Sequence, residues 1–321
     1  MTKRYTYIEQ RPGWGAALTG LVRPPRRERL AVDRLDLQIP CGQIIGLLGP
    51  NGAGKTTAIK MMCGLLRPTA GELEVLGFSP ARRSFDFLRQ ISVVFGQKSM
   101  LWWDVSAHES LVIHRHMYDL SQRMFRSAVT DLAERLGVEQ VLHVPVRKLS
   151  LGQRMRCELL LALLHGPRLL FADEPTVGLD VVAKLAVRTF LAEINRDLGT
   201  TIVLTSHDMD DVAALCRRVA VISGGVVGFD GNLDALRAQV RPKKQVTLTY
   251  RTAVVESRGL VDVVTTKPTD DPRVVRLDVP RDDLPHVLAA APTWGQLVDV
   301  EVRDADLEHV MADVFAAAEK A

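Results

Sequence analysis

The stretch that decides the fold is GPNGAGKTT, residues 49–57. An apolar run of strand character, QIIGLL (43–48), precedes it, and AIKMMCGLL (58–66) follows with apolar positions at helical spacing. The stretch therefore links a strand to a helix through a glycine-rich turn. Glycine adopts positive φ at little cost, so such a turn can wrap its N–H groups closely around phosphates at a helix N-terminus. The pattern G-x-x-x-x-G-K-[ST] predicts that Lys55 reaches the β- and γ-phosphates and that Thr56 ligates Mg²⁺.

A pair of carboxylates follows a second apolar run, in RLLFADEP (168–175). Leu169–Ala172 is predicted to be a short buried strand, and Asp173 stands at its end, where α/β sheets place functional groups. We expect Asp173 to hold Mg²⁺ together with Thr56. Glu174 is the candidate general base that activates water for attack on the γ-phosphate. Taken alone, two acidic residues after a strand would more often cap a helix.

A second helix N-terminus with a serine and a glycine lies between these motifs, in KLSLGQRMRCELLLALLHGP (148–167). Residues 150–153 precede a helix predicted from about Met155 to Leu164. Such an end is again suited to phosphate. One nucleotide needs only one cradle, so this end makes sense if it serves a nucleotide held by a second copy of the chain.

Together these motifs resemble the ABC-type ATPases, the nucleotide-binding subunits of ABC transporters, over roughly residues 30–240. The resemblance implies ATP hydrolysis and a head-to-tail dimer that sandwiches two ATP molecules. It implies that Gln97, in VVFGQ, approaches Mg²⁺, that Asp180, in TVGLD, is the D-loop residue, and that His207 contacts the γ-phosphate. The catalytic set is then Lys55, Gln97, Glu174 and His207, and the metal set is Thr56, Gln97 and Asp173. The expected nucleotide contacts are Gly49, Pro50, Asn51, Gly52, Ala53, Gly54, Lys55, Thr56, Thr57, Ser150, Gly152, Gln153 and Asp180.

Two positions depart from the family pattern. Leu151 replaces the first glycine of the family's LSGGQ motif, but Ser150 and Gly152 remain, so we expect function to survive. The aromatic residue that stacks on adenine is missing where the pattern places it, near Arg26. A guanidinium can stack on a base there, and Tyr7 or Trp14 of the N-terminal region could do so instead.

The fold class follows from this order of motifs. We predict an α/β P-loop NTPase with a parallel sheet core, an inserted helical subdomain at about 104–165 and a small C-terminal α+β domain. The predicted boundaries are 1–30 for a basic N-terminal arm, 31–240 for the ATPase domain and 241–321 for the C-terminal domain. A strand is expected at 31–38. In the C-terminal domain we expect three strands and two helices, the second within DLEHVMADVFAAA (306–318).

Composition limits the partners and the compartment. The net charge of +3 is small for 321 residues, which argues against a nucleic-acid binder. The longest apolar runs fall far short of the roughly 20 residues that span a bilayer. The four cysteines, at 41, 63, 157 and 216, lack metal or redox spacing and indicate a reducing compartment. We therefore expect a cytoplasmic protein that reaches the membrane face only through a partner.

Several segments resemble the viologen-exporter-like group of type-two ABC exporters, among them VVFGQKSMLWWDVSAHES and DEPTVGLDVVAK. That resemblance implies one or two separate membrane permease subunits and export of drug-like or cationic compounds. An importer ATPase and a soluble ATP-driven switch are the alternatives. We expect one of Trp102 and Trp103 to pack inward while the other faces the permease. The alternative is that both fill the seam between the core and the helical subdomain.

Overall fold

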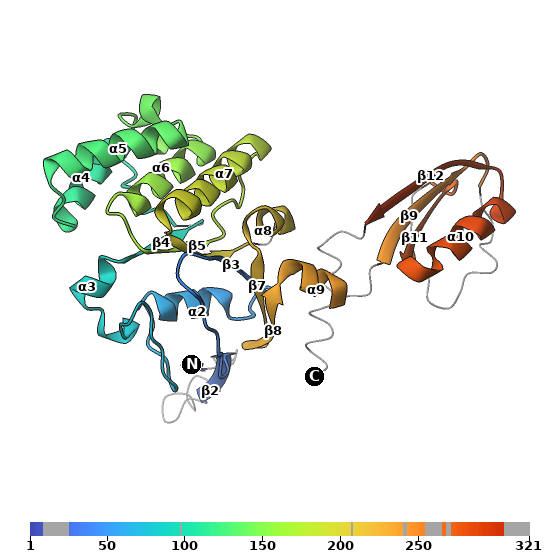
Figure 1. The fold of residues 1–321 in the computed structure, drawn as a ribbon, viewed down its shortest axis with the longest axis horizontal. Coiled ribbons are helices and arrows are strands. Elements are labelled where there is room, and N and C mark those ends of the chain that lie inside the picture. Colours follow the sequence, from blue (N-terminus) through green and yellow to red (C-terminus); the bar gives the residue numbers. More distant parts are fainter. Residues whose placement is uncertain are drawn as a thin grey trace, which may run out of the picture. The chain divides into compact units, whose positions relative to one another are not determined.

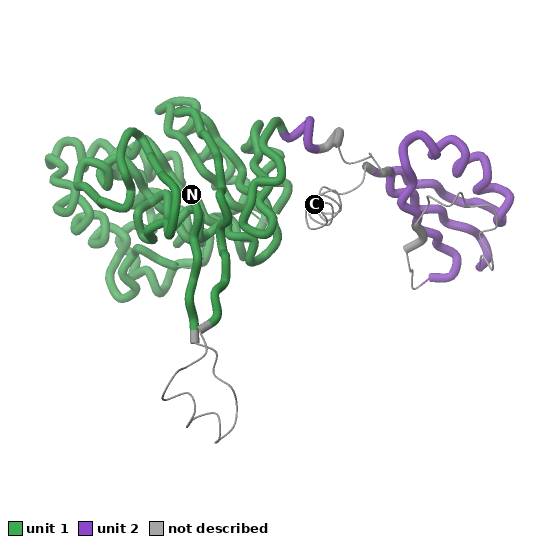
Figure 2. The backbone as a smooth tube through the Cα atoms, turned by 90° about the horizontal axis from the view of Figure 1, so that it is seen from below, with its two compact units in different colours: residues 1–232 green, residues 233–321 purple. Residues whose placement is uncertain are grey.

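The computed structural model describes residues 1–8, 26–96, 98–206, 208–239, 243–253, 265–267 and 271–304. Contact clustering divides the chain into two compact units, Met1–Asn232 and Leu233–Ala321, which Figure 2 shows in different colours. Each unit has a hydrophobic core of its own. No helix in the described part of the chain is both long enough and apolar enough to cross a bilayer.

Unit 1 is built on a six-stranded sheet in the order β4-β5-β6-β3-β7-β8. The strands are β3 (Ile44–Leu48), β4 (Ile91–Phe95), β5 (Leu169–Asp173), β6 (Thr201–Thr205), β7 (Arg218–Ser223) and β8 (Val226–Asn232). The first five strands are parallel, and β8 runs antiparallel to β7. Every residue of β5 and β6 is buried, as expected of parallel strands covered on both faces. The predicted α/β class with a parallel core is confirmed.

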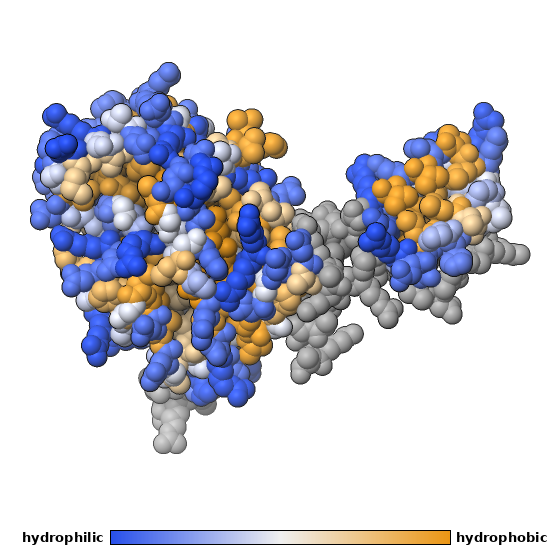
Figure 3. Space-filling view, viewed as in Figure 1, coloured by the Kyte–Doolittle hydropathy of each residue, from blue (hydrophilic) through white to orange (hydrophobic). Residues whose placement is uncertain are grey.

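Helices cover both faces of this sheet (Figure 1). On one side lie α2 (Lys55–Met62) and the short α3 (Phe85–Leu88). The other side carries the predicted helical part, with α4 (Ala107–Met117), α5 (Gln122–Leu136) and α6 (Leu151–Leu163). Next to α6 lies α7 (Val181–Leu198), and α8 (Met209–Leu215) follows β6. Polar and charged side chains cover much of the visible face of this unit, with apolar side chains between them (Figure 3).

The N-terminal region differs from the arm that the sequence suggested. Strand β1 (Lys3–Ile8) pairs antiparallel with β2 (Arg26–Val32) in a hairpin. The expected strand at 31–38 is wrong beyond Val32. Arg34 has φ 43°, which breaks an extended run, and Leu35 instead exchanges backbone hydrogen bonds with Met1. The apolar alternation there reflects packing against the core, where Leu35, Leu37 and Ile39 contact the main cluster.

Unit 2 begins with α9 (Leu233–Gln239) and contains a four-stranded antiparallel sheet in the order β10-β11-β9-β12. Its strands are β9 (Lys243–Tyr250), β10 (Thr265–Lys267), β11 (Val274–Pro280) and β12 (Leu297–Asp304). Helix α10 (Leu284–Ala290) packs on the core face, where Tyr250 donates a hydrogen bond to the Ala291 carbonyl at 2.9 Å. The described part thus has one strand more than expected, β10, and the second expected helix, at 306–318, lies outside the described residues.

Candidate nucleotide site

The glycine-rich loop connects β3 to α2, as the sequence predicts. It is wedged between two neighbouring backbones, which explains why glycine is required at two of its positions. A Cβ on Gly49 would lie 2.2 Å from the Ile222 carbonyl oxygen, and one on Gly54 would lie 2.3 Å from that of Ala31. Gly54 also has φ 107°, a left-handed conformation that side chains disfavour. The loop is therefore held in one shape by β7 and by the end of β2.

The loop leaves the N-terminus of α2 open. Gly54 is the N-cap, and within the described residues no side chain hydrogen-bonds this end and no acidic residue occupies the first turn. The first N–H groups of a helix have no partner inside the helix and carry a partial positive charge. This end is therefore suited to bind a phosphate group.

Lys55 is folded back over the loop. Its Nζ donates to the Gly49 carbonyl oxygen at 2.5 Å and to that of Pro50 at 3.0 Å, and the residue is buried. Burial lowers the pKa of this ammonium, and the nearby carboxylates of Glu174 and Asp173 partly offset that shift. The amine thus lies within the cradle, already partly stripped of water and ready to exchange carbonyl contacts for phosphate oxygens.

Asp173 lies at the end of β5, directly beside the start of α2. Its carboxylate accepts from Thr56 Oγ1 at 3.1 and 3.3 Å and from Thr205 Oγ1 at 2.6 Å. Asp173 is 8% exposed, so these hydroxyls fix a carboxylate that faces little solvent. Carboxylate and hydroxyl oxygens are the hard ligands that Mg²⁺ prefers, and the two predicted ligands Thr56 and Asp173 therefore fit that ion.

Glu174 follows in a backbone conformation that is unusual for its type. Its φ is 56°, and its N–H donates to Thr205 O at 3.0 Å and to Thr205 Oγ1 at 3.1 Å. Non-glycine residues in this region carry strain that surrounding contacts must hold, and such residues concentrate at functional sites. Glu174 and Asp173 line a cleft of about 400 Å³ together with Thr56, Lys60, Leu65, Phe95, Gly96 and Lys98.

Gly96, the residue before Gln97, packs against the backbone of Asp173 and Glu174. Gly96 N–H donates to the Asp173 carbonyl at 2.8 Å, and a Cβ on Gly96 would lie 2.1 Å from the Glu174 carbonyl oxygen. The backbone that leads into Gln97 is therefore in contact with the backbone of the proposed base. Gln97 and His207 themselves lie outside the described residues.

The second phosphate motif is a separate group of residues. Ser150 is the N-cap of α6, where its Oγ accepts from Gln153 N–H at 3.2 Å while Gln153 Oε1 accepts from Ser150 N–H at 3.0 Å. A Cβ on Gly152 would lie 2.8 Å from the Cβ of Ala183, so this end packs closely on α7. Asp180 caps α7 by accepting from Ala183 N–H at 2.8 Å. The structure thus brings the start of α6, with Ser150, Gly152 and Gln153, against the start of α7, which Asp180 caps. Helices α6 and α7 lie on the opposite side of the sheet from α2 (Figure 1).

Comparison with known proteins shows which family has the glycine-rich loop, the carboxylates after β5 and the motif at the start of α6. The family model described as "ABC transporter" matches residues 32–177. The "ABC transporter ATP-binding protein NatA" of Bacillus subtilis (strain 168) is 34% identical over 206 residues, which are 64% of this chain and 83% of NatA. The chain belongs to the ABC transporter family.

Other relatives agree with this membership. The "Probable multidrug ABC transporter ATP-binding protein YbhF" of Escherichia coli (strain K12) is 34% identical over 70% of this chain, which spans only 39% of YbhF. A solved ATP-binding subunit of an ABC transporter, 26% identical, superposes with a TM-score of 0.60 over 65% of this chain and 87% of that one. The predicted P-loop fold and ATPase activity are thereby confirmed.

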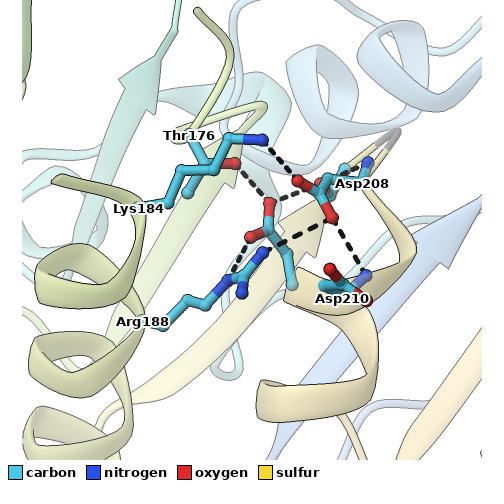
Figure 4. A network of polar contacts seen from close by, with 7 residues as sticks. Thr176, Lys184, Arg188, Asp208 and Asp210 are labelled. Carbon is cyan, nitrogen blue, oxygen red and sulfur yellow. Dashed lines mark hydrogen bonds and ion pairs between the residues drawn. The ribbon is translucent and has the colours of Figure 1, made fainter. Parts of the chain in front are cut away.

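A buried polar network that the sequence did not reveal joins three parts of this ABC ATPase (Figure 4). Asp211 in α8, which is fully buried, accepts from Thr176 Oγ1, from Ser206 Oγ at 2.8 Å and from Arg188 Nε at 2.5 Å. Arg188 Nη2 also lies 3.4 Å from Asp208 Oδ1, and Lys184 Nζ donates to Asp208 at 2.5 Å. The network ties α7 to the loops after β5 and β6, on both sides of position 207.

The hairpin also brings Arg29, which the sequence placed only within a basic arm, to the phosphate loop. Arg29 faces Tyr5 across the β1–β2 pair, and its Nη2 lies 3.3 Å from where a Cβ on Gly52 would be. The guanidinium of Arg29 therefore lies at the phosphate loop. The family pattern expects its adenine-stacking aromatic near Arg26, three residues earlier in the chain. Tyr7 is exposed on the same hairpin, and Trp14 lies outside the described residues. The strand register that places Arg29 depends on pairing with residues 3–8, which local patterns do not show.

Proposed function

We propose that this ATPase is the energy-supplying subunit of an exporter and drives a separate membrane permease from the cytoplasmic face. The names of its relatives support export, since they include the "Daunorubicin resistance ATP-binding protein DrrA3" of Streptomyces coeruleorubidus and the "Nod factor export ATP-binding protein I" of Sinorhizobium fredii. These are 34% and 37% identical over 66% and 65% of this chain. Within the exporters, we place the chain in the viologen-exporter-like group, on the segments quoted above.

The observation that carries the chemistry is the junction of α2 with the end of β5. The open N-terminus of α2, the glycine-rich loop and Lys55 bind the triphosphate of ATP, and Thr57 adds a further hydroxyl. Thr56, Asp173 and Gln97 hold Mg²⁺, which supplies charge neutralisation on the β- and γ-phosphates. The carboxylate of Glu174 accepts a proton from the attacking water, and His207 donates a hydrogen bond to the γ-phosphate.

The second nucleotide contact comes from another copy of the chain. Ser150, Gly152 and Gln153 stand at the start of α6, and Asp180 caps the neighbouring α7. Because both helices lie across the sheet from α2 (Figure 1), these residues serve the ATP held by the phosphate loop of the partner. The exposed apolar residues Val181, Val182 and Leu185 at the start of α7 supply a surface for that contact. Two composite sites result, each completed only in a head-to-tail dimer.

The adjacent tryptophans mark the proposed permease contact. Trp102 is 58% exposed and Trp103 53% exposed, so the expectation that one packs inward is wrong, and so is the alternative that both fill the seam. Large exposed aromatic residues are enriched in the energetic centres of interfaces. We propose that both side chains contact the permease.

Affinity purification of the tagged chain from its own membranes tests this function. We expect polytopic membrane subunits to co-purify with the parental chain, and Trp102→Ala and Trp103→Ala to weaken that association without changing basal ATPase activity. Leu198→Ala, which truncates a similarly exposed side chain at the end of α7, is the matched control. Recovery of a solute-binding importer complex, or of soluble partners only, would favour the importer or the soluble switch instead.

A further inference from the structure

Helix α6 carries a buried carboxylate, that of Glu158, in addition to the Ser150–Gln153 motif at its N-terminus. Glu158 lies two turns into the helix and is only 3% exposed. Its carboxylate accepts from Ser99 Oγ, from Met100 N–H at 3.0 Å and from Leu101 N–H at 3.3 Å. All three donors belong to one short segment, residues 99–101, that lies far from Glu158 in the sequence.

This segment connects two places of proposed function. It begins two residues after Gln97 and runs into Trp102 and Trp103. One turn before Glu158 on the same helix, the guanidinium of Arg154 lies 5.7 Å from the centre of the Trp103 ring. Helix α6 therefore holds the segment at its start through Glu158 and at its end through Arg154.

A carboxylate at this position needs a reason, because burial disfavours its charged form. Burial raises the pKa of Glu158, and the hydrogen bonds from Ser99, Met100 and Leu101 act against that rise. Charge-assisted bonds from two successive backbone N–H groups also fix direction more tightly than apolar packing does. The carboxylate thus fixes the position of the segment relative to the helix.

We propose that Glu158 is a positioning residue that joins residues 99–103 to α6, so that the Ser150 end and the Trp102–Trp103 surface move as one body. The inference rests on the proposed function, in which Ser150 meets ATP held by the partner and the tryptophans meet the permease. ATP engaged at the Ser150 end of α6 then shifts the permease contact that the first two turns of this helix hold through Arg154 and Glu158. Without the Glu158 bonds, α6 still engages ATP, but the segment no longer follows.

Hydrogen exchange of the full chain, measured with and without MgATP, tests this inference. Both the parental chain and Glu158→Gln carry Glu174→Gln so that ATP is not consumed. In the parental chain we expect MgATP to slow exchange at residues 150–154 and at 99–103 together, by at least about fivefold, the lower end of ordinary coupling. In Glu158→Gln we expect the response at 150–154 to persist and the response at 99–103 to fall below about twofold.

Two further variants separate positioning from plain destabilisation. Glu134→Gln removes an exposed carboxylate from α5 and should behave like the parental chain. Ser99→Ala removes one donor while the two backbone donors remain, so it stays folded if Glu158→Gln does not, and it should weaken the response at 99–103 in the same direction. A lowered melting temperature with both MgATP responses retained in Glu158→Gln and Ser99→Ala would overturn the proposal. Loss of the 150–154 response in the parental chain would instead contradict the proposed function.

Discussion

Helices α2 and α6 both have a glycine at or next to their first turn, Gly54 and Gly152, yet their N-termini differ in how they are capped. The end of α2 has a left-handed glycine as its N-cap and no side-chain cap within the described residues. The end of α6 is closed by a capping box between Ser150 and Gln153. An open end offers its N–H groups to an anion at once, whereas a capped end must give up its own hydrogen bonds first.

From this difference we propose that the single chain binds nucleotide at the end of α2. At α2, Lys55 and the hydroxyl of Thr56 are already oriented beside the open helix end, and we propose that the affinity for ATP resides there. At α6, the ligand must compete with Gln153 for Ser150, and the carboxylate of Asp180 lies close by. We therefore assign binding and chemistry to α2 and β5, and to α6 a contact made only when two chains close on ATP.

The largest effect is expected from Glu174→Gln. The amide keeps the size of the side chain but cannot accept a proton, and general bases contribute roughly 10²- to 10⁴-fold to rate. We expect ATP hydrolysis to fall by about 10³-fold with ATP affinity unchanged. Size exclusion with ATP should then show an accumulated dimer. Turnover close to that of the parental chain would show that Glu174 is not the general base.

Lys55→Ala should have the next largest effect, on binding itself. Loss of a charge-assisted contact typically costs about 1.5–3 kcal/mol, which predicts a roughly 10- to 100-fold weaker affinity for MgATP. Calorimetric titration measures this directly. Arg126→Ala, which removes an exposed cation from α5, should leave the affinity unchanged. Equal affinities for Lys55→Ala and the parental chain would mean that the α2 end is not the binding site.

Ser150→Ala tests the N-terminus of α6 and should affect dimerisation rather than ATP binding by the single chain. Removing an N-cap hydroxyl costs about 1 kcal/mol of stability, but ATP affinity of the single chain should not change. ATP-dependent dimerisation should weaken by about tenfold, the equivalent of one lost hydrogen bond. Ser121→Ala is the matched control, because Ser121 caps α5 in the same way, accepting from Met124 N–H at 3.2 Å. If both variants dimerise alike, Ser150 is only a cap.

The smallest effect is expected from ending the chain at about residue 240, which removes all of unit 2 except α9. Every nucleotide contact assigned above lies in unit 1, and compact units with their own cores tolerate separation. We expect the truncated chain to fold and to bind MgATP within about twofold of the parental affinity. Circular dichroism and titration check this. A folded truncation that no longer binds ATP would show that unit 2 contributes to the site.

Local sequence signals were sufficient for the parts of the site whose residues lie close together in the chain. The strand–turn–helix at 43–66, the carboxylates after β5 and a helix N-terminus near Ser150 each follow from a short pattern and its flanks, although α6 begins at Leu151 and not near Met155. Their meeting in space, with Asp173 beside Thr56, follows from the rule that parallel strands end at one edge of a sheet. The phosphate loop therefore lies where the sequence predicted it.

Contacts between distant segments could not be predicted. Arg29 reaches Gly52 only because residues 26–32 pair with residues 3–8, and the basic composition of both segments suggested a solvated arm. Asp211 and Glu158 looked like ordinary acidic residues on helices, because nothing near them in the sequence indicates that they are buried. Their partners, Thr176 and Arg188 in one case and residues 99–101 in the other, become visible only once the helices are packed.

A mixed dimer tests whether the α2 end of one chain and the α6 end of another complete each site. Differently tagged chains carrying Lys55→Ala and Ser150→Arg, both with Glu174→Gln, are combined, and the ATP retained by the purified mixed dimer is counted. If Ser150 serves the nucleotide of the partner, one composite site carries both lesions and the other carries neither. The account predicts one tightly held ATP per mixed dimer, and none in either parent homodimer. Equal loss at both sites of the mixed dimer would show that Ser150 acts within its own chain and would contradict the account.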